Sequence, residues 1–246
     1  MTLITGLRCS DAVVLASDSQ VTVEGGLKTS AQKLFRTRQG IIWGTAGSIA
    51  AAQAIAAHFD QLIMDANPGR DAGRQGVKKV VLAAVADLTG TDDRLPGGLF
   101  KGLFAWYSVQ EQQHYLLQAR SDGILELQEQ GFAAVGSPSS QELARFAFFG
   151  FTSSRFLEYE TLPLEVAKML IHTITGDAVD ASAQAVDGPI QLAVANATEA
   201  TVLEEADLKP VQDTANAFRM HQADFLKRTK RPAEQGGASG LIPGSD

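Results

Sequence analysis

The sequence predicts an α+β protein in which two antiparallel sheets lie between layers of helices. Segments with strand patterns follow one another across turn residues, which is typical of antiparallel pairing. Segments with helical patterns come in pairs between those groups of strands, whereas a parallel sheet would alternate single strands with single helices. The chain has 246 residues, of which 45% are hydrophobic and 20% are charged. Because no internal linker or repeat interrupts it, we expect a single domain over residues 1–229 and a disordered tail over residues 230–246.

The first part of the chain is predicted to form strands and then a helix. The expected strands span residues 3–9, 12–19, 33–37 and 40–45. Turn residues at 10–11 join the first two strands as a hairpin. The segment 46–48 leads into an Ala-rich helix, in which Ile55, Phe59 and Leu62 recur at a spacing of three to four residues and form one apolar stripe.

The remainder is predicted to form a second helix, further strands and then mainly helices. The second helix has its apolar residues on one side and ends at Gly90. The next strands are expected at residues 103–109, 115–119, 124–127 and 131–135. The segment 136–140 begins a short helix that runs to about Phe149, and Pro163 suits the first turn of another helix. A strand at residues 190–194 and a final helix at residues 210–228 complete the prediction.

Composition and charge disfavour several classes of function. The chain has 21 Lys and Arg residues and 28 Asp and Glu residues, and the resulting net charge of -7 argues against nucleic-acid or acidic-membrane binding. No stretch reaches the length of about 18 apolar residues that a membrane span requires, and no secretory leader pattern is present. The single cysteine, Cys9, cannot form an internal disulfide. We therefore expect a cytoplasmic protein.

The sequence contains no pattern for a metal or cofactor site. Its four histidines are scattered without the spacing of metal ligands, at His58, His114, His172 and His221. The paired glycines at residues 25–26 and 97–98 match neither a phosphate loop nor a dinucleotide fingerprint. We therefore expect an activity that needs neither a metal nor a cofactor.

Thr2 is the candidate nucleophile. A small residue after Met1 allows an aminopeptidase to remove the methionine and leave threonine at the N-terminus. The α-amine then has a pKa of about 8, so near cellular pH it can accept the hydroxyl proton directly or through one water. Such a site needs no histidine. Most chains that begin Met-Thr lose the methionine without any catalytic consequence, so Thr2 alone does not establish a site.

The segments that follow Thr2 resemble the start of a mature proteasome β-subunit. In TLITGLRCSDAVVLASDSQVT, Thr2 leads a strand, Gly6 follows it, and a second strand ends at the Asp-Ser pair of residues 18–19. The apolar KLFR segment begins at Lys33. The TAGS segment at residues 45–48 is similar to the Ala-Gly turn that enters the first long helix in that family.

The resemblance continues to about residue 200, with one departure. Gly-Ser at residues 136–137 is similar to a motif of the family, and VDGPIQLAVA at residues 186–195 is similar to a late strand. The family usually has an Asp and a Ser-Gly-Gly segment beside the nucleophile, whereas this chain reads AQAVDG at residues 183–188. Asp187 and Ser182 are the nearest substitutes, and the sequence does not decide between them.

The resemblance implies a four-layer αββα sandwich of the N-terminal nucleophile (Ntn) hydrolase type, acting as a threonine-type endopeptidase. Carried over to this chain, Thr2 would be the nucleophile, and Lys33 would ease proton transfer beside it. Asp18 would hold Lys33 as an ion pair, because a buried ammonium needs a partner. The backbone N–H of Gly47 would bind the oxyanion, and Ser137 would orient the α-amine.

Each of the supporting residues also has a simpler interpretation. Asp18 would only cap a turn, and Lys33 would be a surface lysine on an edge strand. Gly47 with Ser48 would be a helix N-cap, and Ser137 an ordinary loop residue. Their joint occurrence in this order favours a site.

The resemblance also implies partners. It predicts a homo-oligomeric ring, with six or seven subunits and stacking into a double ring, that receives unfolded proteins or peptides and could work with an ATP-dependent unfoldase. Simpler bacterial homologues, related to HslV-type peptidases, fit best. Two alternatives are a catalytically silent ring or scaffold protein and a small-amide hydrolase of the same broad class. The aromatic cluster at residues 146–149 is interpreted either as core or as a subunit interface. The basic run at 227–231 is interpreted as a solvated helix end, with contact to an anionic partner or an assembly surface as alternatives.

Overall fold

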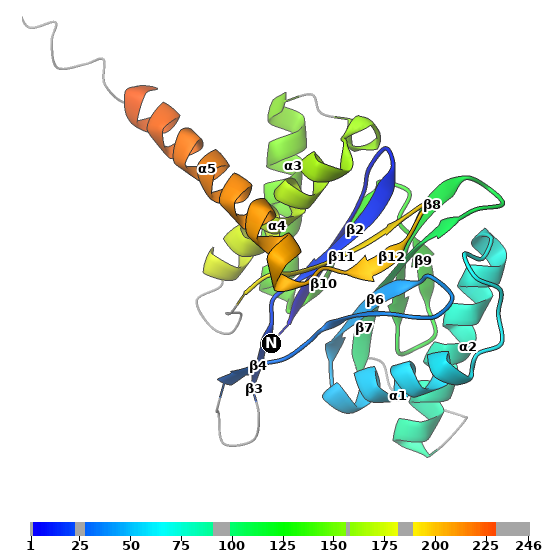
Figure 1. Cartoon of the computed structure of the whole chain (residues 1–246). Coiled ribbons are helices and arrows are strands. Elements are labelled where there is room, and N and C mark those ends of the chain that lie inside the picture. Colours follow the sequence, from blue (N-terminus) through cyan, green and yellow to red (C-terminus); the bar gives the residue numbers. More distant parts are fainter. Residues whose placement is uncertain (1, 23–27, 91–98, 156–157, 182–188, 230–246) are drawn as a thin grey trace, which may run out of the picture.

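The chain folds into two stacked five-stranded sheets with helices on both outer faces (Figure 1). The computed structural model describes residues 2–22, 28–90, 99–155, 158–181 and 189–229. Its α-helices are α1 (Ile49–Gln61), α2 (Arg70–Thr89), α3 (Pro138–Arg155), α4 (Leu164–Ala181) and α5 (Glu205–Thr229). Helices α1 and α2 pack on one sheet, and α3 and α4 pack on the other. The predicted αββα sandwich is therefore confirmed. The expected tail at residues 230–246 lies outside the described residues.

The first sheet places the start of the chain in its interior. Its strands are β1 (Leu3–Arg8), β2 (Ala12–Ser17), β10 (Phe132–Gly136), β11 (Gln191–Asn196) and β12 (Ala200–Val202). They lie in the order β10-β1-β2-β11-β12, and every neighbouring pair is antiparallel. The predicted hairpin of β1 and β2 is closed by a hydrogen bond of 2.9 Å from the Cys9 N–H to the Ala12 carbonyl. Leu3 pairs with Gly136, so Thr2 lies beside the junction of β10 and α3.

The second sheet is a meander of consecutive strands. They are β5 (Leu34–Arg36), β6 (Ile42–Gly47), β7 (Phe100–Ser108), β8 (Gln113–Arg120) and β9 (Leu125–Leu127), and all neighbouring pairs are antiparallel. The strands β3 (Gln20–Thr22) and β4 (Lys28–Ser30) follow β2 and form a separate two-stranded sheet (Figure 1). The segments between β2 and β5 therefore connect the two large sheets at one end of the sandwich.

Three apolar layers hold the sandwich together. Ile4 and Leu103 belong to the layer between the two sheets. Leu3 and Leu7, which alternate with Ile4 along β1, pack with the helical layer that includes Leu170 of α4. Because side chains of a strand alternate between faces, a strand buried on both sides needs apolar residues at nearly every position. This requirement explains the apolar sequence of β1 and β2.

Helix α1 begins and helix α2 ends where the sequence predicts. The Ser48 hydroxyl caps α1 by accepting a hydrogen bond of 3.2 Å from the Ala50 N–H. Gly90 ends α2 in the left-handed conformation, with φ at 64°, which glycine adopts without steric cost. Ile55 and Phe59 of the predicted stripe are buried in α1, whereas Leu62 is the residue that follows the last turn of the helix.

Several boundaries differ from the sequence prediction. The three-residue strands β3, β4 and β12 were not predicted, whereas β5 and β9, which are equally short, were. The sequences of β3 and β4, QVT and KTS, are largely polar and lack the apolar residues that mark β5 and β9. Helix α5 begins at Glu205 instead of residue 210, so Pro210 lies inside it; Glu205 and Asp207 favour its N-terminus. Helix α3 runs beyond Phe149 to Arg155, and the partly buried Phe151 packs against the core there.

The aromatic cluster of α3, residues 146–149, is partly buried in the core and partly exposed. Phe148 is 3% exposed and stacks on Phe132, so the core interpretation holds for this residue. Phe146 is 81% exposed and Phe149 49% exposed, so the core interpretation is wrong for Phe146. A subunit interface at these exposed rings stays a prediction. No helix among the described residues has both the length and the apolarity needed to cross a membrane.

His172, on the buried side of α4, is expected to make stability depend on pH. Burial, with a smaller contribution from Arg219 of α5, lowers the pKa of His172 from 6.5 to about 4. In the unfolded chain the imidazole gains a proton as the pH falls through about 6.5, whereas in the folded chain it stays neutral down to about 4. Protonation therefore favours unfolding in this range, and the free energy of unfolding should fall by about 2 kcal/mol between pH 6.5 and 4.

Urea unfolding at several pH values measures this effect. The variant His172→Gln should lose most of the fall below pH 6.5, because it carries no titratable group at this position. His221, which is exposed on α5, provides the matched variant His221→Gln, and we expect it to keep the pH dependence of the parent protein. An unchanged pH dependence in His172→Gln would assign the acid sensitivity to other groups.

Candidate active site

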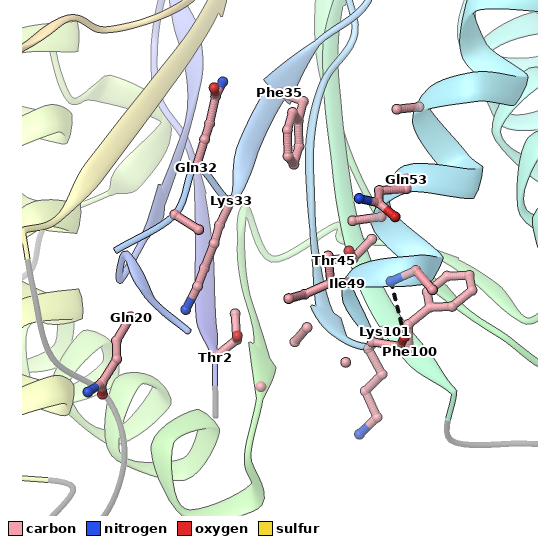
Figure 2. Close-up of a pocket in the computed structure, with 18 of the residues that line it drawn as sticks. Thr2, Gln20, Gln32, Lys33, Phe35, Thr45, Ile49, Gln53, Phe100 and Lys101 are labelled. Atoms are coloured by element: carbon pink, nitrogen blue, oxygen red, sulfur yellow. Dashed lines mark hydrogen bonds between the residues drawn. The ribbon is translucent and has the colours of Figure 1, made fainter. Parts of the chain in front are cut away.

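A cavity of about 920 Å³ opens where strand ends of both sheets meet (Figure 2). Four of the five residues predicted for the site line it, namely Thr2, Lys33, Gly47 and Ser137. Thr2 precedes β1, Lys33 precedes β5, Gly47 ends β6, and Ser137 follows β10. The fifth, Asp18, follows β2 and contacts Lys33 without lining the cavity. The fold thus brings together five residues that are up to 135 positions apart in the sequence, from Thr2 to Ser137.

Asp18 and Lys33 form a buried ion pair. The Lys33 Nζ lies 2.6 Å from the Asp18 Oδ2, and the two side chains are 6% and 0% exposed. The interpretation of Lys33 as a surface lysine is therefore wrong. Asp18 does accept a hydrogen bond of 3.2 Å from the Gln20 N–H, as a turn-capping residue would, but this is only one of its contacts.

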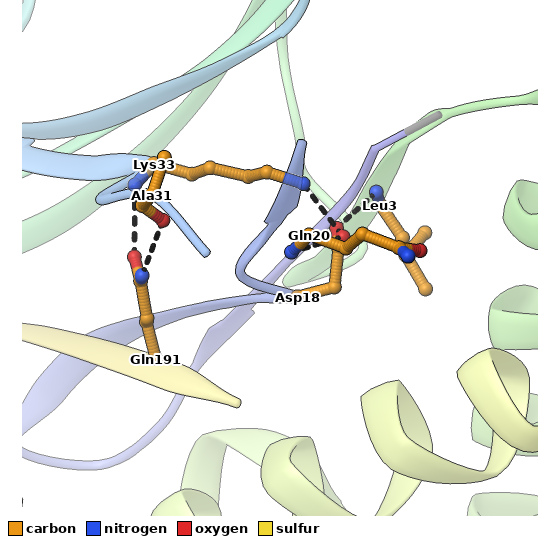
Figure 3. Close-up of polar contacts among 6 residues, drawn as sticks. All are labelled: Leu3, Asp18, Gln20, Ala31, Lys33 and Gln191. Carbon is orange, nitrogen blue, oxygen red and sulfur yellow. Dashed lines mark hydrogen bonds and ion pairs between the residues drawn. The ribbon is translucent and has the colours of Figure 1, made fainter. Parts of the chain in front are cut away.

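Asp18 also fixes the backbone beside the candidate nucleophile. Its Oδ1 accepts a hydrogen bond of 2.8 Å from the N–H of Leu3, the residue that follows Thr2 (Figure 3). One carboxylate therefore holds both the lysine and the start of β1. Figure 2 shows the Lys33 side chain extending from its strand toward Thr2. This arrangement keeps the ammonium and the Thr2 hydroxyl in the same small region.

Burial shifts the proton affinity of both partners. Desolvation lowers the pKa of Lys33 below its usual value, although the attraction of Asp18 acts in the opposite direction. Desolvation likewise raises the pKa of Asp18, opposed by Lys33 and by the N–H donors of Leu3 and Gln20. A lysine whose pKa is lowered gives up its proton more readily than an exposed one. The pair is therefore suited to proton transfer, and ionisable groups with a shifted pKa beside a cavity are typical of functional sites.

Gln191 holds the segment that carries Lys33, and sequence reasoning gave this residue no role. Its Oε1 accepts a hydrogen bond of 2.8 Å from the Lys33 N–H, and its Nε2 donates one of 2.7 Å to the Ala31 carbonyl (Figure 3). Gln191 is the first residue of β11 and pairs with Ser17, which precedes Asp18. The only sequence signal was a glutamine at the start of an apolar strand. Its partners become visible only in the fold.

Removing the Gln191 amide should loosen Lys33 without removing any charge. In Gln191→Ala, two hydrogen bonds to the backbone of residues 31 and 33 are lost. Stability should fall by about 1–3 kcal/mol, because two backbone groups lose their partners. Urea unfolding measures this loss. Gln118→Ala, at a half-buried position of β8, is a matched control that should leave the free energy of unfolding nearly unchanged.

Gly47 lies where a side chain cannot fit. Its φ is 140°, in a region that L-residues rarely adopt, and a Cβ at this position would collide with the Leu99 carbonyl and with Phe100 of β7. Gly47 lies immediately before Ser48, the N-cap of α1. The N-cap interpretation is therefore correct for Ser48, while Gly47 lines the cavity at the positive end of the helix dipole.

Ser137 caps α3 and also lines the cavity. Its Oγ lies 2.7 Å from the Ser140 Oγ and accepts a hydrogen bond of 3.4 Å from the Ser140 N–H. Its simpler interpretation, a loop residue before a helix, thus agrees with the structure. Because Ser137 lines the same cavity as Thr2, a role in orienting the α-amine stays a prediction.

Buried polar atoms beside Asp18 form a feature that sequence reasoning missed. The hydroxyls of Ser17 and Ser19 and the Oε1 of Gln20 are buried without a hydrogen-bond partner in the described part of the chain. Gln20 is 5% exposed and lines the cavity. Unpaired buried polar atoms are costly, so their concentration beside the ion pair is unusual. The segment 183–188, where the sequence departs from the family pattern, lies outside the described residues.

The described residues contain no cluster of three or more histidine, cysteine, aspartate or glutamate side chains that could hold a metal ion. The groups that the cavity offers are the Thr2 hydroxyl, the Lys33 ammonium that is paired with Asp18, and the N-termini of two helices.

Solved structures similar to this chain share its fold. The chain aligns over 97% of its length with all of an Anbu (Gly-1) mutant from Hyphomicrobium sp. strain MC1, at a TM-score of 0.68 and 16% identity. It aligns over 99% of its length with all of Anbu (ancestral beta-subunit) from Yersinia bercovieri, at a TM-score of 0.67 and 14% identity. At these identities the similarity shows the fold alone. No curated protein sequence matches the chain.

A match to a protein-family model shows the family as well as the fold. The model described as "Proteasome subunit" matches residues 2–146, which is more than half of the chain and includes Thr2, the ion pair, Gly47 and Ser137. This agrees with the two-sheet sandwich and with the resemblance of the N-terminal segments. The chain therefore belongs to the proteasome subunit family.

Proposed function

We propose that the chain is an N-terminal threonine peptidase of the proteasome β-subunit type. The observation that carries the proposal is the cavity in which Thr2 lies with Lys33, Gly47 and Ser137, backed by the buried contact of Lys33 with Asp18. Membership in the proteasome subunit family supports the same reaction class. The proposal requires that Met1 be removed, since only then does Thr2 carry a free α-amine.

The first half of the reaction is attack on a peptide bond. The α-amine of Thr2 takes the proton from the Thr2 Oγ, directly or through a water, and the Oγ bonds to the carbonyl carbon of the substrate. The ammonium of Lys33 lowers the proton affinity of the hydroxyl by its nearby positive charge. The N–H of Gly47, at the N-terminus of α1, receives the oxyanion of the tetrahedral intermediate. The C–N bond then breaks, and the leaving amine takes the proton from the α-ammonium.

The second half releases the product. A water loses a proton to the α-amine and attacks the ester carbonyl carbon, and the oxyanion again forms at Gly47. When the bond to the Thr2 Oγ breaks, the Oγ regains its proton from the α-ammonium, and the product leaves as a carboxylic acid that loses its proton to water. Both halves use the same base, so the site needs no histidine.

We also propose that the active chain is part of a homo-oligomeric ring, with a stacked double ring and an ATP-dependent unfoldase as further possibilities to test. Family membership supports a ring, and the exposed Phe146 and Phe149 of α3 supply an apolar surface of the kind that subunit contacts use. Unfolded chains or peptides would be the substrates. Analytical ultracentrifugation of the purified protein measures the assembly state.

Hydrolysis of short peptides tests the proposed reaction. A library of fluorogenic peptides, together with an unfolded protein such as casein, should be cleaved by the purified protein, and a peptide epoxyketone should abolish this cleavage. A ring that cleaves no peptide and no unfolded protein would instead support the silent scaffold. A small oligomer that hydrolyses only small amides would support the third hypothesis.

A further inference from the structure

The cavity beside Thr2 has a charge pattern that the proposed reaction does not explain. Among the described residues that line it there are two lysines, Lys33 and Lys101, and no aspartate or glutamate. The whole chain carries a net charge of -7, so an excess of positive charge at this one place is unusual for the protein. Lys33 is compensated by Asp18.

Lys101 has no acidic partner among the described residues, since none of their ion pairs includes it. Lys101 is half-buried on β7 and pairs with Ala46 of β6, so its side chain lies on the same face of the sheet as that of Ala46. In Figure 2 its side chain lies at the opposite end of the cavity from Phe35. No described acidic side chain therefore competes with a group that enters the cavity for this ammonium.

Two helix N-termini add to this positive field. Gly47, Ser48 and Ile49 at the start of α1 line the cavity, and so do Ser137 and Pro138 at the start of α3. Neither helix has an acidic residue in its first turn. The N-terminus of a helix carries a partial positive charge, which favours anions.

The other three α-helices differ in this respect. Each has at least one acidic residue in its first turn, namely Asp71 in α2, Glu165 in α4, and Glu205 and Asp207 in α5. The negative charge of these acids offsets the partial positive charge at the N-termini of helices that do not border the cavity. The absence of such acids is therefore confined, among the described helices, to the two that border the site.

Gln20 contributes an unpaired acceptor to the residues that line the cavity. Its side chain is 5% exposed and lines the cavity, and its Oε1 has no hydrogen-bond donor in the described structure. A peptide backbone N–H is a donor that would satisfy this atom. The cavity wall near Phe35 is apolar, with Ala52 and Ala56 of α1. The site thus offers an acceptor for a peptide, an apolar wall and, at its other end, a positive field.

We propose that Lys101, together with the N-termini of α1 and α3, makes the cavity select peptides that carry a carboxylate beside the scissile bond over peptides that carry an amine there. This inference rests on the proposed peptidase function and names its substrate class. Lys101 acts as a specificity-determining residue, since it contacts the bound chain and takes no part in bond breaking.

Kinetics with matched peptides test the proposal. Internally quenched peptides share one sequence except at the residue immediately before or immediately after the scissile bond. One set carries Glu, Gln or Lys at the first of these positions, and a second set carries them at the other. At one of these positions, kcat/KM should fall in the order Glu, Gln, Lys, with about a tenfold difference between Glu and Lys, as partly exposed ion pairs provide. The difference should shrink as ionic strength rises.

Variants of Lys101 separate its role from a general effect of charge. Lys101→Glu should reverse the order, Lys101→Met should reduce the difference, and Lys101→Arg should keep it. The matched control is Lys79→Glu, which makes the same charge change on an exposed position of α2 and should leave the order unchanged. Equal cleavage of the three peptides, or an unchanged order in Lys101→Glu, would overturn the proposal.

Binding distinguishes a failure of this inference from a failure of the peptidase function. If the protein cleaves none of the peptides, the peptidase function fails, and fluorescence anisotropy with the same labelled peptides still measures selection by the cavity. Tighter binding of the Glu peptide, reversed in Lys101→Glu, would support the inference for a silent family member. Equal binding of the Glu and Lys peptides would overturn it.

Discussion

Replacing Thr2 with alanine should abolish peptide hydrolysis, with a loss of at least about 10³-fold in kcat. The variant keeps a small residue after Met1, so removal of the methionine and the position of the α-amine stay the same. Only the Oγ that forms the ester is lost. The side chain of Thr2 lines the cavity and does not belong to an apolar core layer, so the fold should stay intact. Fluorogenic peptide hydrolysis and circular dichroism measure the two effects.

The variant Thr2→Ser serves as the positive control for this result. Serine supplies a hydroxyl at the same position, so hydrolysis should persist at a reduced rate. If Thr2→Ala keeps the hydrolytic rate of the parent protein, the nucleophile is another group or the activity comes from a contaminant. If neither the parent nor Thr2→Ser hydrolyses any peptide while both fold, the silent-ring hypothesis gains support.

Replacing Asp18 with alanine should cost both stability and activity. The change leaves the Lys33 ammonium buried without a partner, which typically destabilises a protein by about 3–5 kcal/mol. It also removes the acceptor of the Leu3 N–H, so the start of β1 beside Thr2 is no longer fixed. We therefore expect kcat to fall at least about 100-fold. Urea unfolding and steady-state kinetics measure these losses.

Asp122 provides a matched control for the ion pair. Its carboxylate lies 2.6 Å from an Arg120 nitrogen, the same distance as in the Asp18–Lys33 pair, but the two side chains are 22% and 43% exposed. Because exposed ion pairs contribute little, Asp122→Ala should cost less than about 1 kcal/mol and leave kcat unchanged. Equal losses of stability in Asp18→Ala and Asp122→Ala would contradict the account of a buried pair.

A double variant separates the structural role of the pair from its catalytic role. Asp18→Leu combined with Lys33→Met removes both buried charges and fills the space with apolar groups, so it should recover much of the stability that Asp18→Ala loses. Activity should stay lost, because no ammonium remains beside Thr2. Full recovery of activity in the double variant would show that the pair is only structural.

Elements of this fold that carry a clear local signal could be predicted from the sequence, and elements without one could not. The β1–β2 hairpin, the start of α1 and the end of α2 depend on local signals, namely turn residues, the Ser48 cap and Gly90. The short strands β3 and β4 are largely polar and were not predicted, whereas the equally short β5 and β9 contain apolar residues and were. Helix α5 starts earlier than predicted because its acidic first turn outweighs the signal of Pro210.

Some residues of the candidate site could likewise be predicted from the sequence, and others could not. Thr2, Asp18, Lys33, Gly47 and Ser137 were available from the sequence because they resemble motifs of a known family. The structure brings four of them to one cavity and places Asp18 in contact with Lys33. Their catalytic roles stay proposals. The contacts of Gln191 and the unpaired amide oxygen of Gln20 could not be predicted, since both depend on which strand ends meet in three dimensions. The missing acids at α1 and α3 acquire meaning only once both helices are seen to border one cavity.

The most direct test of the account is the intact mass of the purified protein before and after exposure to a peptide epoxyketone, a reagent that reacts with a threonine bearing a free α-amine. The account predicts a mass that lacks Met1 and gains one inhibitor adduct, which fragmentation locates on Thr2 and which Thr2→Ala abolishes. A protein that retains its methionine and gains no adduct would contradict the claim that Thr2 is an N-terminal nucleophile.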